Sequence, residues 1–459
     1  MALLLRKSII TKFHPLSAWY GRLTKNGENC TVLAIEEYPN WFTAQPPRWD
    51  FVLICFLISA YLFLGLAVVC DGFCVPAVEK LRNQWHLPYD VTGATLMAGA
   101  TSAPEFFIHL YATIITKSDM GIGTIMGSAV FNGLAIIGLC GLVAGAGIQL
   151  DWWPISRDIL WYIFAIAALT AFIYDGRIEW WEATTLIILF VVNTFSLFLD
   201  RKLQRAWRKP GRKCVCPCFR PKGEVFDLLD HEVDEDENGE PPFNFCRCPK
   251  EGGCCAIFLW ILSYPWECIF FLTVPNCKRK LTRKCALLCF LLSIGWIAIL
   301  TYLLSWMITV IGFNIFVPDS VMGITFLAAG TSIPEMISSY IVARKGYGSM
   351  AVCNAIGSNS VDILFCLATP WLIRSLTNYH DPEVNFVDFN SKALYQSTGI
   401  LFVCILVLYL IFMINRFHLN ITLGIFCMSM FICYVVFASL IELNVFFEVN
   451  LPNCPLSDQ

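Results

Sequence analysis

The chain has 459 residues, of which 57% are hydrophobic and only 15% are charged, and its formal net charge is −3. Its mean hydropathy of +0.62 lies far outside the range of soluble globular proteins. These values exclude a soluble domain and predict a membrane protein, with the lipid bilayer as partner and no nucleic acid.

Ten apolar runs have the length, roughly 20 residues, that a helix needs to cross a bilayer. The first five lie near 50–70, 92–116, 121–147, 158–175 and 179–199. After a polar break, five more lie near 287–311, 319–343, 349–374, 396–415 and 420–442. The sequence therefore predicts an all-α polytopic membrane protein with ten transmembrane helices in two sets of five.

The distribution of Lys and Arg predicts the orientation. The stretch from Arg201 to Lys284 holds 16 of the 32 basic residues, and such residues are retained on the cytoplasmic side. Five spans precede this stretch, which places the N-terminus outside, where Asn29 begins a glycosylation sequon. The expected organisation is an extracellular segment 1–50, a first five-helix half 51–200, a Cys-rich and acidic cytoplasmic loop 201–284 with an interfacial segment at 256–274, a second half 285–445 and an extracellular tail 446–459.

One segment occurs twice, 230 residues apart. GATLMAGATSAPEFF begins at Gly93 and GITFLAAGTSIPEMI begins at Gly323, and the alignment continues without a gap into IMGSAVFNGL and AIGSNSVDIL. The copies, 93–133 and 323–363, are separated by five spans and must cross the membrane in opposite directions. Inverted repeats of this kind are typical of secondary transporters, whose ion sites form at the midplane between the halves.

The first part of each copy offers oxygen ligands. Proline inside a helix frees a carbonyl one turn earlier, so Pro104 and Pro334 predict broken helices. Glu105 and Glu335 follow the prolines, and an acid in the middle of a membrane helix costs ~3 kcal/mol. Two such acids could neutralise one divalent cation or hold Na⁺ ions. The neighbouring hydroxyls complete a hard oxygen set that suits Ca²⁺ or Na⁺ rather than Zn²⁺ or Cu²⁺; they are Thr101, Ser102, Thr331 and Ser332.

The second part of each copy breaks the symmetry. It contributes Ser128 and Asn132 in the first half and Ser358, Asn359 and Asp362 in the second. Asn132 aligns with Asp362, so the site gains a third carboxylate. This charge exceeds what Ca²⁺ requires and leaves room for an additional monovalent cation.

Several alternatives stay open from the residues alone. The acids could be structural hydrogen-bonding groups, and Gly121, Gly123 and Gly127 could serve helix packing. His109 is expected to be a packed residue more often than a proton relay. An intramembrane hydrolase would need a nucleophile or a metal-binding histidine beside Glu105 and Glu335, and only His109 is available. A channel would conduct without a counter-ion. The loop cysteines favour lipid attachment over Zn²⁺ binding.

The two repeats resemble the signature repeats of the cation/calcium exchanger superfamily and, within it, the potassium-dependent sodium/calcium exchangers. CDGFCVPAVEKL after the first span, EEYPNWF near Cys30 and PWLI at 370–373 also fit that group. The resemblance implies an antiporter, not an enzyme, that exchanges Na⁺ for Ca²⁺ plus K⁺ by alternating access and without a cofactor. The expected location is the plasma membrane, with the membrane of an intracellular organelle as the alternative. The alternative is exchange without K⁺, either Na⁺/Ca²⁺ or H⁺/Ca²⁺. A homodimer is a further open expectation.

The resemblance also implies the roles of single residues. Glu105 and Glu335 would be the central Ca²⁺ and Na⁺ ligands, and Asp362 would accompany K⁺ transport. The remaining ligands would be the hydroxyls of Thr101, Ser102, Thr331 and Ser332, the carbonyls of Ala98 and Ala328, and the side chains of Ser128, Asn132, Ser358 and Asn359.

The chain departs from the family pattern at several positions. Glu335 stands where animal exchangers usually have Asp, and Gly99-Ala100 reverses the usual order. Ile108-His109 replaces small polar residues, Asn359-Ser360-Val361-Asp362 replaces Asn-Val-Phe-Asp, and Ser349 replaces a loop Asp.

Overall fold

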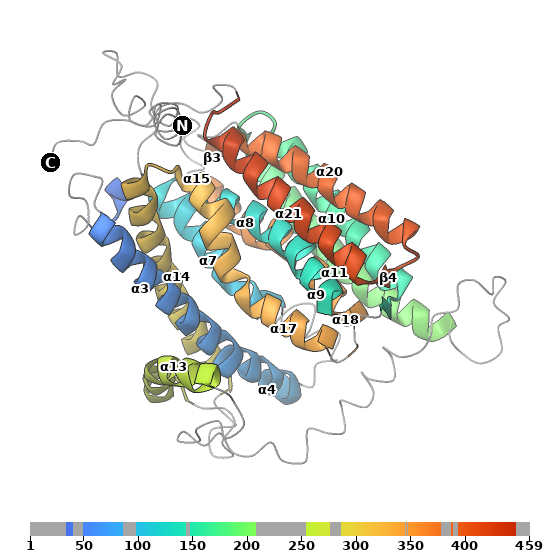
Figure 1. Cartoon of the computed structure of the whole chain (residues 1–459), viewed down its shortest axis with the longest axis horizontal. Helices are drawn as coiled ribbons and strands as arrows, with labels where there is room; N and C mark the ends of the chain where they lie inside the picture. The colour runs from blue at the N-terminus through green and yellow to red at the C-terminus, as the bar shows by residue number, and fades with distance from the viewer. Residues whose placement is uncertain are drawn as a thin grey trace, which may run out of the picture.

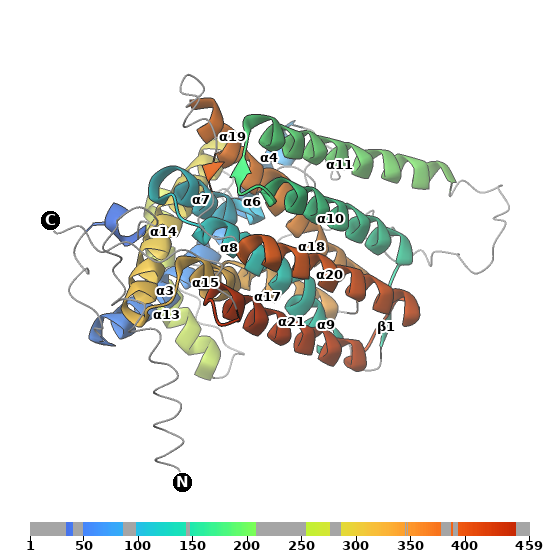
Figure 2. The same cartoon turned by 90° about the horizontal axis from the view of Figure 1, so that it is seen from above.

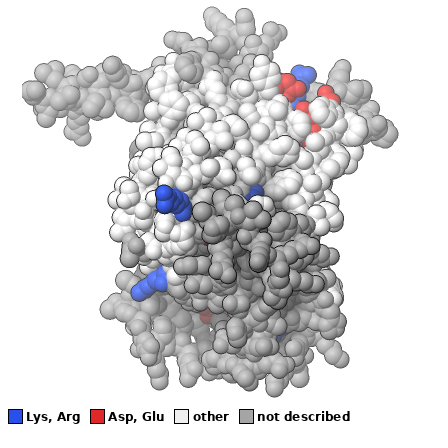
Figure 3. Space-filling view, turned by 90° about the vertical axis from the view of Figure 1, so that its right-hand side faces the viewer, with Lys and Arg blue, Asp and Glu red and all other residues white. Residues whose placement is uncertain are grey.

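The protein is a bundle of long apolar helices. The computed structural model describes residues 34–39, 49–85, 98–143, 147–207, 254–275, 286–344, 346, 348–377, 387–388 and 393–446. Within these residues, eight helices are long and apolar enough to cross a membrane: Trp49–Leu81, Met120–Val143, Trp152–Ile173, Trp180–Leu197, Ala286–Ile315, Gly348–Thr377, Ala393–Ile414 and Ile421–Glu442. The bent pair Asp319–Thr331 and Ile333–Arg344 makes nine if it counts as one span. The face in Figure 3 carries few charged side chains among its described residues, as a surface against lipid requires.

The described residues therefore contain fewer candidate spans than the ten that the sequence predicts. The span predicted at 92–116 begins in residues outside the described ranges and continues as α6 (Ala98–Thr101), α7 (Ala103–Tyr111) and η5 (Ala112–Thr116). The segment predicted to be interfacial forms α13 (Cys254–Thr273). Asn29, most of the predicted cytoplasmic loop and the tail after Phe446 lie outside the described residues.

The first span is longer than predicted. The sequence placed its end near residue 70, because Asp71 and Gly72 interrupt the apolar run. In the structure, α3 (Trp49–Val69) continues through η3 (Cys70–Cys74) into α4 (Val75–Trp85). The turn at η3 is a widened, π-helical one, in which the Val75 amide donates to the Cys70 carbonyl. The helix continues because Asp71 lies on its exposed side and does not have to enter the core.

The helices form two groups around a central one (Figures 1 and 2). On one side, α3 packs along α14 (Ala286–Ile315), and a core of their apolar side chains extends to Ile35 and Tyr38 of the N-terminal segment. On the other side lie α10 (Trp152–Ile173), α11 (Trp180–Trp207), α20 (Ala393–Ile414) and α21 (Ile421–Glu442). Between the groups, 83% of the Met120–Val143 span is buried; it comprises α8 (Met120–Val130), η6 (Phe131–Ile136) and α9 (Ile137–Val143).

Glycines allow α8 to approach the bent helix of the second repeat. That helix is built from α15 (Asp319–Met322), η9 (Gly323–Leu327), α16 (Ala328–Thr331) and α17 (Ile333–Arg344). A Cβ at Gly127 would lie 2.3 Å from the Ile324 carbonyl oxygen, and one at Gly323 would lie 2.5 Å from the Met120 carbonyl oxygen. The backbones touch here, so helix packing accounts for these two glycines.

Two short antiparallel sheets join the halves of the chain. Strand β1 (Ile148–Gln149) pairs with β4 (His418–Leu419), and β2 (Arg177–Ile178) pairs with β3 (Val387–Asp388). Each pair combines one strand from the first half with one from the second. In the predicted topology, both strands of β1–β4 fall on the cytoplasmic side and both strands of β2–β3 fall outside.

Candidate ion-binding site

Both repeats contain a helix break at the predicted position. α6 ends at Thr101 and α7 begins at Ala103, with Ser102 at φ −88° and ψ 8° between them. α16 ends at Thr331 and α17 begins at Ile333, with Ser332 at φ −84° and ψ 1°. The second pair of segments is bent by 47°. Pro104 and Pro334 lie two residues after these serines and have no amide hydrogen. They therefore cannot donate a helical hydrogen bond to the preceding turn, and the helix breaks there.

Three acids are buried near these breaks. Glu105 on α7 is 2% exposed, Glu335 on α17 is 8% exposed, and Asp362 at the start of η10 (Asp362–Leu367) is 2% exposed. Glu335 interacts electrostatically with both other carboxyl groups, and Asp362 interacts with Glu105. The ion pairs found among the described residues join Arg157 to aspartates elsewhere and involve none of the three acids. Such a cluster of buried carboxyl groups requires bound cations or protons.

The amide of Asn132 links the repeats at Glu335. Asn132 Nδ2, on η6, donates to Glu335 Oε2 at 2.6 Å and lies 3.5 Å from Ser358 Oγ, which belongs to α18 (Gly348–Val361). At the offset of 230 residues, the counterpart of this pair is Asp362 with Glu105. An amide donor satisfies Glu335, whereas the equivalent pair consists of two carboxyl groups that interact electrostatically.

Six buried oxygens of the site have no hydrogen-bond partner within the described part of the chain. A buried polar group left without a partner costs about 1–3 kcal/mol, so six together make this place a candidate ligand site. Their number and type suit a hard cation. The six are Ser102 Oγ, Glu105 Oε2, Asn132 Oδ1, Ser332 Oγ, Asn359 Oδ1 and Asp362 Oδ1.

The site is not a cluster of acidic ligands alone. Among the described residues, no three His, Cys, Asp or Glu side chains converge closely enough to hold one metal ion. Hydroxyl, amide and carbonyl oxygens would therefore have to complete the coordination. Thr331 lies beside Glu105, and Ser102 lies beside Asp362.

The other predicted ligands use part of their hydrogen-bonding capacity locally. The hydroxyls of Ser128, Thr331 and Ser358 donate to carbonyls of their own helices. The Ala328 carbonyl accepts from the Ser332 amide at 3.3 Å and from Thr331 Oγ1 at 3.3 Å. The three hydroxyl oxygens keep a free lone pair for a cation, whereas the Ala328 carbonyl uses both of its lone pairs in these hydrogen bonds. Thr101 and Ala98 lie on α6, directly before the first break.

Asn359 makes a contact of a different kind. Its Nδ2 donates to the Ala129 carbonyl at 3.1 Å, and the Tyr162 hydroxyl donates to the same carbonyl at 3.2 Å. Residues 129 and 359 occupy equivalent positions of the two repeats, so the repeats meet there directly. Only the amide oxygen of Asn359 is left for a ligand.

Two residues of the site were missed by the sequence analysis. Cys366 lies beside Asp362, and its Sγ donates to the Ser102 carbonyl at 3.6 Å. Its position one helical turn after Asp362 was a usable signal, since residues four apart share a helix face. Tyr162 comes from α10, far along the chain, and nothing in the local sequence singles it out.

His109 is a packed residue, as expected. It is buried with its ring against the edge of Trp371 at a centroid distance of 5.5 Å. Its Nε2 lies 3.4 Å from Thr113 Oγ1. These neighbours give it a structural role.

This chain is similar to known proteins over most of its length. The profile of the family described as "Sodium/calcium exchanger protein" matches residues 53–199 and 285–440. Sodium/potassium/calcium exchanger 5 of Homo sapiens is 33% identical, with 94% of this chain and 92% of that protein aligned. Sodium/potassium/calcium exchanger 4 of Mus musculus is 31% identical, with 95% and 89% aligned.

A solved structure shares the fold. The crystal structure of the H⁺/Ca²⁺ exchanger CAX superimposes with a TM-score of 0.55 at 12% identity and covers 88% of this chain and 87% of that one. At this identity the match concerns the fold alone. Since the family profile spans well over half of the chain and the relatives align over nearly all of it, this chain belongs to the sodium/calcium exchanger protein family.

Proposed function

We propose that this protein is an antiporter that exchanges Na⁺ for Ca²⁺ together with K⁺ across a membrane. The observation that carries the proposal is the set of three buried carboxyl groups and unpaired oxygens beside two helix breaks. Relatives aligned over most of their length are named sodium/potassium/calcium exchangers. They are transporters and not enzymes, and because the ions are substrates, no cofactor is involved.

The charge of the site supports K⁺ as a substrate. When ionised, Glu105, Glu335 and Asp362 carry three negative charges, which one Ca²⁺ and one K⁺ balance. Na⁺ ions that enter the same ligand set would replace both. The same ligands bind either Na⁺ or Ca²⁺ with K⁺. The carrier changes its orientation when it is loaded with one of these two sets of ions, and this competition couples the Na⁺ flux to the Ca²⁺ and K⁺ fluxes.

Ten spans in two inverted five-helix repeats would place this site at the midplane. The contact between Asn359 and Ala129, at equivalent positions, supports a pseudo-twofold relation between the repeats. The strand pairs β1–β4 and β2–β3, each combining segments predicted on the same side, support it as well. In this arrangement the α3–α14 pair, packed at the edge of the bundle, would move against the core to expose the site to one side at a time.

If the protein lies in the plasma membrane, the predicted topology places Asn29 outside the cell as a glycosylation acceptor. An enzyme that removes N-linked glycans would then increase the electrophoretic mobility of the protein. The Asn29→Gln variant should show the higher mobility without treatment. Intact cells labelled with an impermeant biotin reagent would show whether the protein reaches the surface.

Ion replacement in vesicles tests the proposed function. Purified protein is reconstituted into Na⁺-loaded vesicles, and uptake of radioactive Ca²⁺ is measured with K⁺ or choline outside. Uptake that requires external K⁺ supports exchange of Na⁺ for Ca²⁺ plus K⁺. Uptake that is the same in choline would leave Na⁺/Ca²⁺ exchange without K⁺, and uptake driven by a proton gradient instead of Na⁺ would indicate H⁺/Ca²⁺ exchange.

A further inference from the structure

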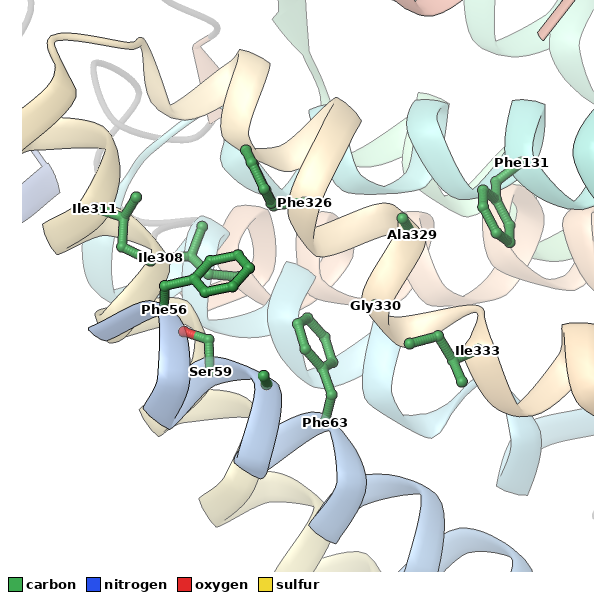
Figure 4. A pocket seen from close by; sticks show the side chains of 11 residues that line it. Phe56, Ser59, Phe63, Phe131, Ile308, Ile311, Phe326, Ala329, Gly330 and Ile333 are labelled. Carbon is green, nitrogen blue, oxygen red and sulfur yellow. The ribbon is translucent and has the colours of Figure 1, made fainter. Parts of the chain in front are cut away.

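An apolar cavity of about 260 Å³ lies between the α3–α14 pair and the helix break of the second repeat. Figure 4 shows Phe56 and Phe63 of α3 on one side and Phe326, Ala329 and Gly330 of the bent helix on the other. Ser59 brings the only hydroxyl of the lining and is itself 4% exposed. The cavity is therefore lined almost entirely by apolar groups.

The cavity opens toward the hydrocarbon of the membrane. Phe56 is 48% exposed and Phe326 is 49% exposed, and their rings meet edge to face at 6.4 Å. Ala60, which lines the cavity one turn along α3, is exposed as well. All three residues belong to segments long and apolar enough to span the bilayer. Apolar cavities of this kind exclude water, and at this depth the surrounding solvent is lipid hydrocarbon.

The cavity adjoins a contact between the Phe63 ring and the backbone just before the second break. A Cβ at Gly330 would lie 1.9 Å from Phe63 Cζ, so the ring rests directly on this glycine. Gly330 immediately precedes Thr331 and Ser332 of the candidate site. A molecule in the cavity would thus touch both α3 and the segment that carries the ligands.

From this arrangement we infer that the acyl chain of a membrane lipid occupies the cavity between α3 and α16 and limits the movement of α3 against the break. The occupant is hydrocarbon because the lining is apolar and the mouth faces the bilayer. The acyl chain would affect transport because it fills the space into which Phe63 would move relative to Gly330. Binding of the chain is independent of which ions the protein exchanges, so it can be tested without a transport assay.

Photolabelling tests the occupant. The full chain is reconstituted in phosphatidylcholine vesicles that contain a phosphatidylcholine with a diazirine in one acyl chain, and labelled peptides are mapped by mass spectrometry. We expect enrichment in the peptides that carry Ala60 and Ala329 over other lipid-facing peptides. Ala60→Trp should reduce that labelling about tenfold, which corresponds to the loss of one well-packed contact. Ala171→Trp, at an exposed alanine of α10 away from the cavity, is the matched control and should leave it unchanged.

The same variants test the effect on movement. Ala60→Trp should change the rate of Ca²⁺ uptake severalfold with little change in the Ca²⁺ concentration for half-maximal uptake, whereas Ala171→Trp should change neither. Ala60→Leu fills less of the cavity and replaces Ala60→Trp in the test if the tryptophan variant does not fold. Labelling that is not enriched at the cavity, or that Ala60→Trp and Ala60→Leu leave intact, would overturn the lipid site. Reduced labelling with an unchanged uptake rate would overturn its influence on transport.

Discussion

Asn132 Nδ2 donates a 2.6 Å hydrogen bond to Glu335 Oε2, across 203 positions of sequence and between the two repeats. At the equivalent position of the other repeat, Asp362 replaces the asparagine and interacts electrostatically with Glu105. Glu335 thus has an amide donor, whereas Glu105 has a carboxyl group at the equivalent position. We therefore expect the two halves of the proposed site to treat cations unequally.

Removal of the amide donor should weaken ion binding. Asn132→Leu leaves Glu335 without its partner, and hydrogen bonds to charged groups contribute about 1.5–3 kcal/mol. We expect the Ca²⁺ concentration for half-maximal uptake to change by roughly 10- to 100-fold, the factor that such a free energy represents. Thr124→Val is the control, because this hydroxyl on the same helix donates only to the Met120 carbonyl. Equal effects of both substitutions would mean that α8 and η6 are merely sensitive to packing.

Neutralisation of either central acid should abolish exchange. Glu105→Gln and Glu335→Gln keep the shape of the side chain but remove the charge that would balance Ca²⁺. We expect Na⁺-dependent Ca²⁺ uptake to fall to background in both variants, with normal amounts of protein in the vesicles. Glu335→Asp, the residue usual in animal relatives, retains the charge and should keep transport with a shifted Ca²⁺ affinity. Normal uptake by the two glutamine variants would show that the acids do not bind the transported ions.

The third carboxylate should determine the requirement for K⁺. In Asp362→Asn the site keeps two acids and loses the charge assigned to K⁺. Ca²⁺ uptake by this variant should proceed at the same rate in K⁺ and in choline, whereas the unmodified protein should need K⁺. A variant that still requires K⁺ would remove Asp362 from this role.

The proposed sidedness can be measured at the two strand pairs. Arg177 and His418 are exposed residues of β2 and β4. In a background with the reactive cysteines replaced, an impermeant maleimide applied to intact cells should label Arg177→Cys, and His418→Cys only after permeabilisation. Labelling of both variants from the same side would rule out the inverted arrangement.

Local chemistry explains which features the sequence could predict. The breaks at Ser102 and Ser332 depend on prolines two residues away, and the burial of Glu105 and Glu335 follows from the apolar segments around them. The sequence failed where a local signal was ambiguous: the apolar run ended near residue 70, but an exposed Asp71 and a widened turn let the helix continue to Trp85.

Contacts between distant segments could not be predicted in the same way. Tyr162 reaches the Ala129 carbonyl from another helix, and the bond from Asn132 to Glu335 depends on how α8 and η6 pack against α17. The alignment of the repeats showed that these positions were equivalent, but not that residues 129 and 359 would touch. Such contacts are set by helix packing, which the repeat pattern does not specify.

Obligatory coupling between the ions tests the central claim most directly. Uptake of radioactive Ca²⁺ is measured in vesicles that contain the unmodified protein and either Na⁺ or choline inside, with K⁺ outside. A site that both repeats build, and that must be filled before turnover, predicts uptake with internal Na⁺ and background uptake with internal choline. Equal Ca²⁺ uptake under the two conditions would contradict the account, because a pathway that needs no counter-ion is a channel and not an exchanger.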